Sequence, residues 1–247
     1  MGLLFSLTRS TDTVLPVKDE THSDHDNVHV RRFCTQFEDA YQRGQLYCID
    51  EAGFYVGDHP RKGRSKKGKR LAIGSGRTMR KSKFTLIMAI GVNGIAHFQI
   101  LDHNCKKSDF IEFYSNMDLP RGSVVLMDNL RCHHSREIET ISMERELARL
   151  FTPTYSPRCN PIEKIFGILK PLYRKRCPAI DSLNKEPFRQ VFEGILHEQQ
   201  GITFIKTFEN TLSFLKQTIE TIDANPLFKF IGYDISSFVR LNNSGPQ

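Results

Sequence analysis

Two features are scarce in this sequence, and each scarcity excludes a class of protein. No apolar run approaches the roughly 20 residues that a transmembrane helix needs, so we expect no membrane-embedded segment. The six cysteines include no Cys-x-x-Cys pair, which argues against a disulfide framework and a zinc site and favours a reduced intracellular compartment. Hydrophobic residues make up 39% of the 247-residue chain, enough for one domain of ordinary size with an appendage.

Acidic residues are missing from residues 61–83. This segment holds eleven lysines and arginines, so the formal net charge of +7 leaves −4 for the rest of the chain. Its four glycines indicate an irregular backbone that can follow a nucleic-acid strand, with salt-sensitive phosphate contacts. The alternatives are a solvated loop and a nuclear localisation signal. The candidate nucleic-acid contacts are Arg61, Lys62, Arg64, Lys66, Lys67, Lys69 and Arg70.

Two aspartates follow short apolar runs that contain β-branched residues. Asp50 comes after residues 46–49, and Asp128 comes after residues 124–127. Such runs are typical of buried strands that present a carboxylate at the carboxyl edge of a sheet, where ligands commonly bind. The alternative interpretation of each residue is a turn-forming aspartate.

A glutamate, Glu163, stands at the start of a predicted helix. Asn160 is the predicted N-cap and Pro161 the first helical residue, which puts Glu163 three residues after the cap. Glu163 lies just off the apolar stripe of this helix, and Gly167, four residues on, leaves it uncrowded. A capping box with Asn160 is the alternative role. The predicted core stripe is Ile162, Ile165, Phe166, Leu169 and Tyr173.

These acids belong to a set of sequence words that resembles a known family. The words are residues 49–54 (Ile-Asp-Glu-Ala-Gly-Phe), 63–70, Met127-Asp-Asn with His133 and His134 soon after, and 152–163 running into Lys170. The chain resembles, over about residues 30–176, the catalytic domain of mariner-like transposases and related bacterial insertion elements. These are DDE transposases with a ribonuclease H-like fold. The 34 residues between Asp128 and Glu163 are typical of one large branch of that family.

The resemblance implies a catalytic and metal-binding triad of Asp50, Asp128 and Glu163. Asp50 and Asp128 would hold two Mg²⁺ or Mn²⁺ ions with help from Glu163, for attack by water or a 3′-hydroxyl on a DNA phosphate. Glu51 is not counted as a ligand, because it points to the opposite face if the strand continues through it. Cys132-His133-His134 lacks a second cluster that would complete a zinc site, and we interpret it as a polar segment beside the active site.

The sequence departs from the family pattern at two places. Arg158 and Cys159 stand where an acidic residue and leucine are usual, although neither position holds metal. Only 49 residues precede Asp50, and residues 1–29 are polar without a helix-turn-helix pattern. We therefore expect a catalytic domain without the usual N-terminal DNA reader, which a separate subunit or domain would then supply.

The predicted fold is α/β, a ribonuclease H-like mixed sheet flanked by helices. Besides the runs before the two aspartates, strands are expected at 54–57, 84–92, 95–101 and 150–154, with a hairpin turn at Asn93-Gly94. Helices are expected at 106–117 and 135–148. The predicted units are a polar, flexible segment over 1–29, the catalytic domain over 30–180 and a helical extension over 181–247. An apolar stripe from Phe204 to Ile222 in this extension would pack on the catalytic domain or in a homodimer.

The sequence thus predicts a DDE transposase catalytic domain for metal-dependent cleavage and strand transfer of DNA. One alternative is a transposase-derived protein that binds nucleic acid without catalysis. A second alternative is a structure-selective nuclease of the same fold. DNA is the expected partner, with no membrane association. The expected location is the nucleus in a eukaryotic host, for a host or viral protein, and the cytoplasm otherwise.

Overall fold

The computed structural model describes residues 23–55, 83–154, 156–177 and 186–225. Its centre is a five-stranded mixed sheet in the order β3-β2-β1-β4-β5. The strands are β1 (Leu46–Tyr55), β2 (Lys83–Gly91), β3 (Gly94–Leu101), β4 (Val124–Met127) and β5 (Ala148–Phe151). The first three pair antiparallel, whereas β4 and β5 run parallel to β1. This topology confirms the predicted fold of three antiparallel strands followed by alternating strands and helices.

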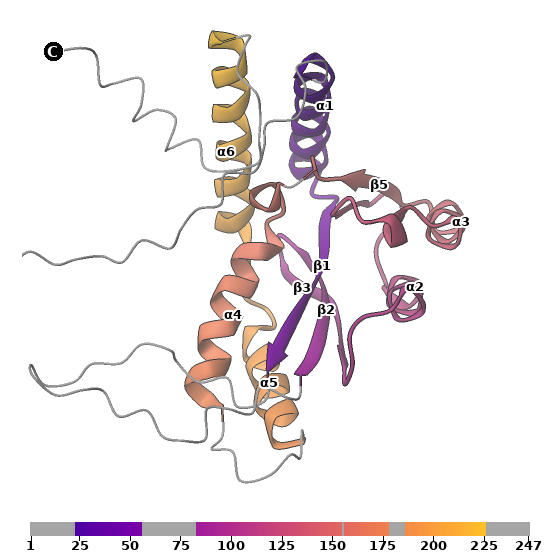
Figure 1. Ribbon diagram of the computed structural model, residues 1–247, viewed down its shortest axis with the longest axis vertical. Helices are drawn as coiled ribbons and strands as arrows, with labels where there is room; N and C mark the ends of the chain where they lie inside the picture. The colour runs from indigo at the N-terminus through magenta and orange to yellow at the C-terminus, as the bar shows by residue number, and fades with distance from the viewer. Residues whose placement is uncertain (1–22, 56–82, 155, 178–185, 226–247) are drawn as a thin grey trace, which may run out of the picture.

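Helices cover both faces of the sheet (Figure 1). On one face lie α2 (Lys107–Asn116) and α3 (Arg136–Glu144), and on the other lie α1 (Ser23–Gln42), α4 (Ile162–Arg176), α5 (Glu186–Gln199) and α6 (Ile205–Ala224). Each face has its own hydrophobic core, because alternate residues of β1 point to opposite sides. Cys48 and Ala52 join the core under α4, and Ile49 joins the core under α2 and α3.

Strand β1 is longer than the sequence predicted. Instead of ending at Asp50 and resuming at 54–57, it runs without a break from Leu46 to Tyr55. The polar residues at 50 and 51 interrupt the apolar pattern, yet antiparallel pairing with β2 continues from Cys48 to Tyr55. Backbone hydrogen bonds to a neighbouring strand therefore hold this stretch extended.

The second helix on the α2–α3 face is shorter than predicted. Helix α3 ends at Glu144, four residues before the expected end, and β5 already begins at Ala148. The chain turns at Glu146, whose φ of 57° is left-handed and ends the helix in the way that glycine usually does. Without a glycine to mark this turn, the local pattern favours a continued helix.

Helix α1 begins at Ser23, inside the segment predicted to be polar and flexible over 1–29. Its buried residues Val30, Phe33, Phe37 and Ala40 recur at helical spacing and join the core under α4. Helix α6 lies beside α1 (Figure 1), with ion pairs Arg31–Asp223 (2.6 Å) and Glu38–Lys216 (2.7 Å). The predicted stripe of the C-terminal extension thus packs against the catalytic domain. None of the described helices combines the length and apolarity that crossing a membrane requires.

Gly94 begins β3 with a φ of +126°, after a turn at Val92 and Asn93. A Cβ atom at this position would lie 2.9 Å from the carbonyl oxygen of Ile202. We expect Gly94→Ala to lower the free energy of unfolding by about 1–3 kcal/mol, because the backbone conformation and the space both oppose a side chain. Urea denaturation followed by circular dichroism measures the change.

Gly194 offers a matched control, because it is exposed in α5, has an ordinary φ, and leaves open space of at least 4 Å around an added Cβ. Gly194→Ala should raise the free energy of unfolding by about 0.5–1 kcal/mol through helix propensity. Loss of stability in both variants would show that the positive φ and the close Ile202 carbonyl at Gly94 do not explain the effect there.

Candidate active site

Asp50 and Asp128 lie side by side on neighbouring strands. The parallel register pairs Cys48 with Leu126, and the same register continued by two residues brings Asp50 beside Asp128. Strand β4 ends at Met127, so Asp128 follows its carboxyl end as predicted. Asp50 instead lies within β1, at the point where β4 stops beside it. Because β4 ends there, no strand of the described structure pairs with this side of β1 beyond this point, and both carboxylates lie at the edge of the sheet that is left.

Glu163 reaches this edge from the first turn of α4, and Asn160 fixes that helix to β1. The Asn160 side chain accepts a hydrogen bond from the Ile162 N–H (3.3 Å) and donates one to the carbonyl oxygen of Ile49 (3.4 Å). Asn160 is 3% exposed, which makes these bonds important for a buried amide. The helix itself begins at Ile162, with Pro161 preceding it, one residue later than predicted. Asn160 thus links the strand of Asp50 to the helix of Glu163.

A cavity of about 400 Å³ lies among these elements, and all three acids line it. Its other walls come from the ends of β4 and β5 and from the short 3₁₀ helix η4 (Pro157–Cys159) before α4. Burial, together with the negative charges of Glu51, Glu163 and Asp128, raises the pKa of Asp50 well above its ordinary value. A cation in the cavity would relieve this repulsion.

The chemistry of the donor set fits a hard divalent cation, since Mg²⁺ and Mn²⁺ prefer carboxylate oxygens. Among the described residues, however, no three His, Cys, Asp or Glu side chains are arranged so that they could hold a metal ion as they stand. Uncompensated carboxylates repel one another, so rotation of the side chains would have to accompany metal binding. The assignment of Asp50, Asp128 and Glu163 as metal ligands stays a prediction.

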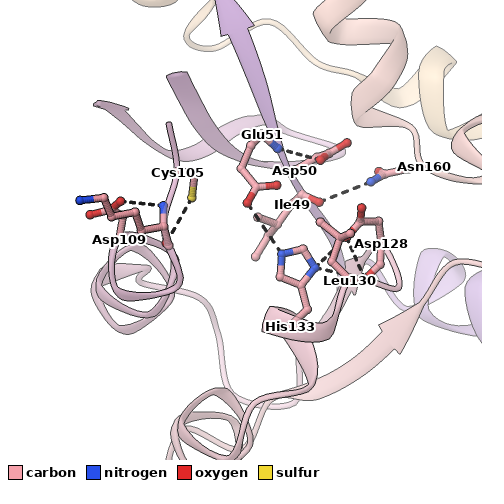
Figure 2. A network of polar contacts seen from close by, with 10 residues as sticks. Ile49, Asp50, Glu51, Cys105, Asp109, Asp128, Leu130, His133 and Asn160 are labelled. Atoms are coloured by element: carbon pink, nitrogen blue, oxygen red, sulfur yellow. Dashed lines mark hydrogen bonds and ion pairs between the residues drawn. The ribbon is translucent and has the colours of Figure 1, made fainter. Parts of the chain in front are cut away.

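His133 lies beside Asp128 in a network of polar contacts (Figure 2). It belongs to the 3₁₀ helix η3 (Arg131–His134), and its side chain is 1% exposed. Its Nδ1 lies 2.7 Å from Oδ1 of Asp128 and 3.1 Å from the Asp128 carbonyl oxygen. Because a carbonyl oxygen only accepts, Nδ1 must carry the proton and donate. The bond engages Oδ1 of Asp128, a residue that also lines the cavity.

The other ring nitrogen of His133 faces Glu51, which lies on the opposite face of β1 from Asp50. The Nε2 atom is 3.8 Å from Oε1 of Glu51, an ion-pair distance that is too long for a hydrogen bond. Although burial disfavours the charged ring, its contacts with Asp128 and Glu51 outweigh this and raise the pKa of His133 to about 10. His133 is therefore a cation between two carboxylates at neutral pH.

The remaining residues of Cys132-His133-His134 form no metal centre in the described structure. His134 hydrogen-bonds Asn129 and stacks on Phe151 with ring centroids 4.0 Å apart. These contacts agree with the predicted polar segment beside the active site. The predicted nucleic-acid contacts at 61–70 lie outside the described residues.

Comparison with known proteins identifies the family. Residues 45–184, more than half of the chain, match the family model described as DDE superfamily endonuclease. The chain belongs to the DDE superfamily endonucleases. No curated protein sequence matches it significantly.

Solved structures show the fold of this DDE endonuclease domain in more detail. The Mos1 transposase paired-end complex with its left transposon end superposes with a TM-score of 0.65 at 13% identity, over 87% of this chain and 66% of that one. The catalytic domain of Mos1 mariner transposase alone superposes with a TM-score of 0.56 at 11% identity, over 84% of this chain and 97% of that one. The chain thus spans about two thirds of the longer Mos1 chain and nearly all of its catalytic domain. At these identities the likeness establishes the ribonuclease H-like fold.

Two features of the DDE endonuclease site were not predicted from the sequence. The first is the link from Asn160 to β1, since the prediction gave Asn160 only a capping role. The second is the placement of His133 between Asp128 and Glu51. In the sequence, Asn160 and His133 are recognisable only as polar residues close to a predicted metal ligand. Their partners, Ile49 and Glu51, are known only from the tertiary structure.

Proposed function

We propose that this chain is the catalytic domain of a transposase that cuts DNA strands with divalent metal ions and joins the freed 3′ ends to new DNA. The observation that carries the proposal is that the three acids of a DDE family member line one cavity. In a complex of related fold, Mos1 transposase is bound to its transposon end. Mos1 paired-end complexes with Mg and with Mn are also known.

Asp50, Asp128 and Glu163 would hold the metal ions. Two bound Mg²⁺ or Mn²⁺ ions would lower the pKa of an attacking water or 3′-hydroxyl and stabilise the leaving oxygen of the phosphate. Asp128 lines the cavity, while His133 and the Leu130 N–H (3.4 Å) hold its Oδ1. Asn160 links the strand that carries Asp50 to the helix that carries Glu163. These contacts fix the elements that carry the three acids, so that rotation of the side chains would be enough to bring the carboxylates onto a metal ion.

Strand cleavage by the purified protein tests the proposal. A labelled duplex should be nicked with Mg²⁺ or Mn²⁺, the products should carry 3′-hydroxyl ends, and EDTA should stop the reaction. DNA binding without cleavage under any divalent metal would contradict the catalytic proposal. That result would favour the alternative of a transposase-derived nucleic-acid-binding protein. We would expect such a protein in the cellular compartment that contains its DNA.

We also expect DNA contacts from the basic segment at 61–83. Replacing Lys66, Lys67, Lys69 and Arg70 with glutamine should weaken binding to all DNA sequences alike. It should also flatten the dependence of log K on log salt by about 0.9 for each duplex phosphate that the variant no longer neutralises. Fluorescence anisotropy over a salt series measures the slope. An unchanged slope would assign the segment to solvent or to nuclear import.

A further inference from the structure

Helix α4 exposes a face of basic residues that extends away from the cavity. After Glu163 the helix contains five cations and no acid: Lys164, Lys170, Arg174, Lys175 and Arg176. Arg176 forms an ion pair with Glu198 of α5 (2.7 Å) and belongs to the packing between these helices. Lys164 and Lys175 are exposed, and Lys170 and Arg174 are partly exposed. The catalytic chemistry of the three acids does not use these residues.

Helical periodicity arranges this face in two rows with a path between them. One row is Glu163, Gly167, Lys170 and Arg174, and the other is Lys164, Ile168, Pro171 and Lys175. Gly167 lies at the inner edge of the first row, and a Cβ added there would meet no atom within 4 Å. Because no side chain covers Gly167, a ligand can approach the helix backbone between the rows. The path ends at Glu163 and so at the cavity.

The lysines of this face have no acidic partner in the described structure, whereas many cations elsewhere on the described surface do. Ion pairs join Arg31 to Asp223, Lys107 to Glu137 and Lys216 to Glu38, and further pairs occur elsewhere. Within the described part of the chain, Lys164, Lys170 and Lys175 form no such pair. Their charge is therefore available to an external anion.

Stabilisation of the helix explains only part of this charge. Cations in a last turn interact favourably with the helix dipole, which accounts for Arg174, Lys175 and Arg176. Lys164 stands in the first turn, where a cation is unfavourable, and Arg158 of η4 adds a second positive charge nearby. The Arg158 guanidinium lies 4.2 Å from the centre of the Phe214 ring of α6, which fixes its position. The helix dipole therefore does not account for the cation at Lys164.

We infer that the outer face of α4 binds the sugar-phosphate backbone of DNA and leads the strand to be cut into the cavity. The inference rests on the proposed function, because it takes DNA as the substrate. From Lys164 to Lys175 the helix rises about 16 Å, which matches about five phosphates along one strand. Ile168, 51% exposed in the second row, can contact the apolar edge of deoxyribose. The binding is independent of base sequence, since phosphates carry no sequence information.

Charge removal with a matched control tests this surface. Lys164, Lys170 and Lys175 are replaced with glutamine in one variant, and Arg32, Arg136 and Lys206 in the other. The control residues are exposed cations on α1, α3 and α6, again without an ion pair among the described residues. Both variants lose the same net charge. The α4 variant should flatten the slope of log K against log salt by up to about 2.7, at about 0.9 per phosphate, whereas the control slope should stay at the wild-type value.

Two matched leucine substitutions distinguish the loss of a DNA contact from a change in helix stability. Gly167→Leu places a side chain on the path, and Gly194→Leu places one on the equally open surface of α5. Both should stabilise their helices. We expect only Gly167→Leu to weaken DNA binding, by about tenfold or more.

Binding is measured by anisotropy with Ca²⁺ as the divalent ion, so the result does not depend on cleavage. If wild type binds DNA but never cleaves it, the proposed catalysis fails while the α4 surface is still tested by these variants. Equal slopes for the two charge variants, equal affinities for the two leucine variants, or no DNA binding by wild type would each overturn the inference.

Discussion

Replacing Asp128 with asparagine should lower the rate of metal-dependent DNA cleavage by about 10³-fold or more, equivalent to roughly 4 kcal/mol of transition-state stabilisation. Asparagine has nearly the same shape, and its side-chain oxygen can still accept the hydrogen bonds from His133 and from the Leu130 N–H. What it loses is the negative charge that a divalent cation needs. The rate is measured on a labelled duplex at saturating Mg²⁺.

Fold and DNA binding should survive this substitution, because Asp128 follows β4 at the cavity and belongs to neither hydrophobic core. Asp118→Asn is the matched control, since it removes the same charge from an exposed loop between α2 and β4. The control should cleave like wild type. Equal cleavage by Asp128→Asn and wild type would place the activity at another site or in a contaminant.

The sequence predicted most of the sheet because buried strands leave a local pattern. The edges of β2, β3 and β4 lie within one residue of the predicted ones. The errors occur where a distant partner decides the local structure. Strand β1 continues through Asp50 and Glu51 because β2 pairs with it, although the two strands are joined through the basic segment. Helix α1 extends back to Ser23, into the segment that looks polar in the sequence, because apolar residues further along the same helix meet the core and α6.

The candidate site shows the same division between local and distant information. The three acids could be found from sequence, because a strand end and a helix start each carry a local signature, and the family resemblance joined them. The partners that orient them could not be found. Asn160 meets Ile49 across 111 positions of sequence, and Glu51 meets His133 only because β1 continues past Asp50. Glu51 follows Asp50 on the other face of β1, as expected for a continuous strand, yet it also lines the cavity, and its contact with His133 was not predicted.

His133 has the geometry of a positioning residue rather than a catalytic one. It lies outside the lining of the cavity, and its ring is packed against Phe110 with centroids 4.2 Å apart. Its hydrogen bond engages one oxygen of Asp128 and so restrains the orientation of this carboxylate. Residues that orient metal ligands in this way commonly contribute about 10- to 100-fold to metal affinity or activity.

We therefore expect His133→Ala to raise the Mg²⁺ concentration for half-maximal cleavage by about 10- to 100-fold. Loss of the buried ring also lowers stability, so the measurement needs variants that separate the two effects. His133→Asn should restore much of the Mg²⁺ affinity, because its amide can donate to Asp128 from the position of Nδ1. Phe110→Leu should lower the free energy of unfolding by about 1 kcal/mol without changing the Mg²⁺ midpoint, because it disturbs the packing and leaves the hydrogen bond intact. A Mg²⁺ midpoint that follows stability across all three variants would reduce His133 to a packing residue and leave Asp128 oriented by the backbone alone.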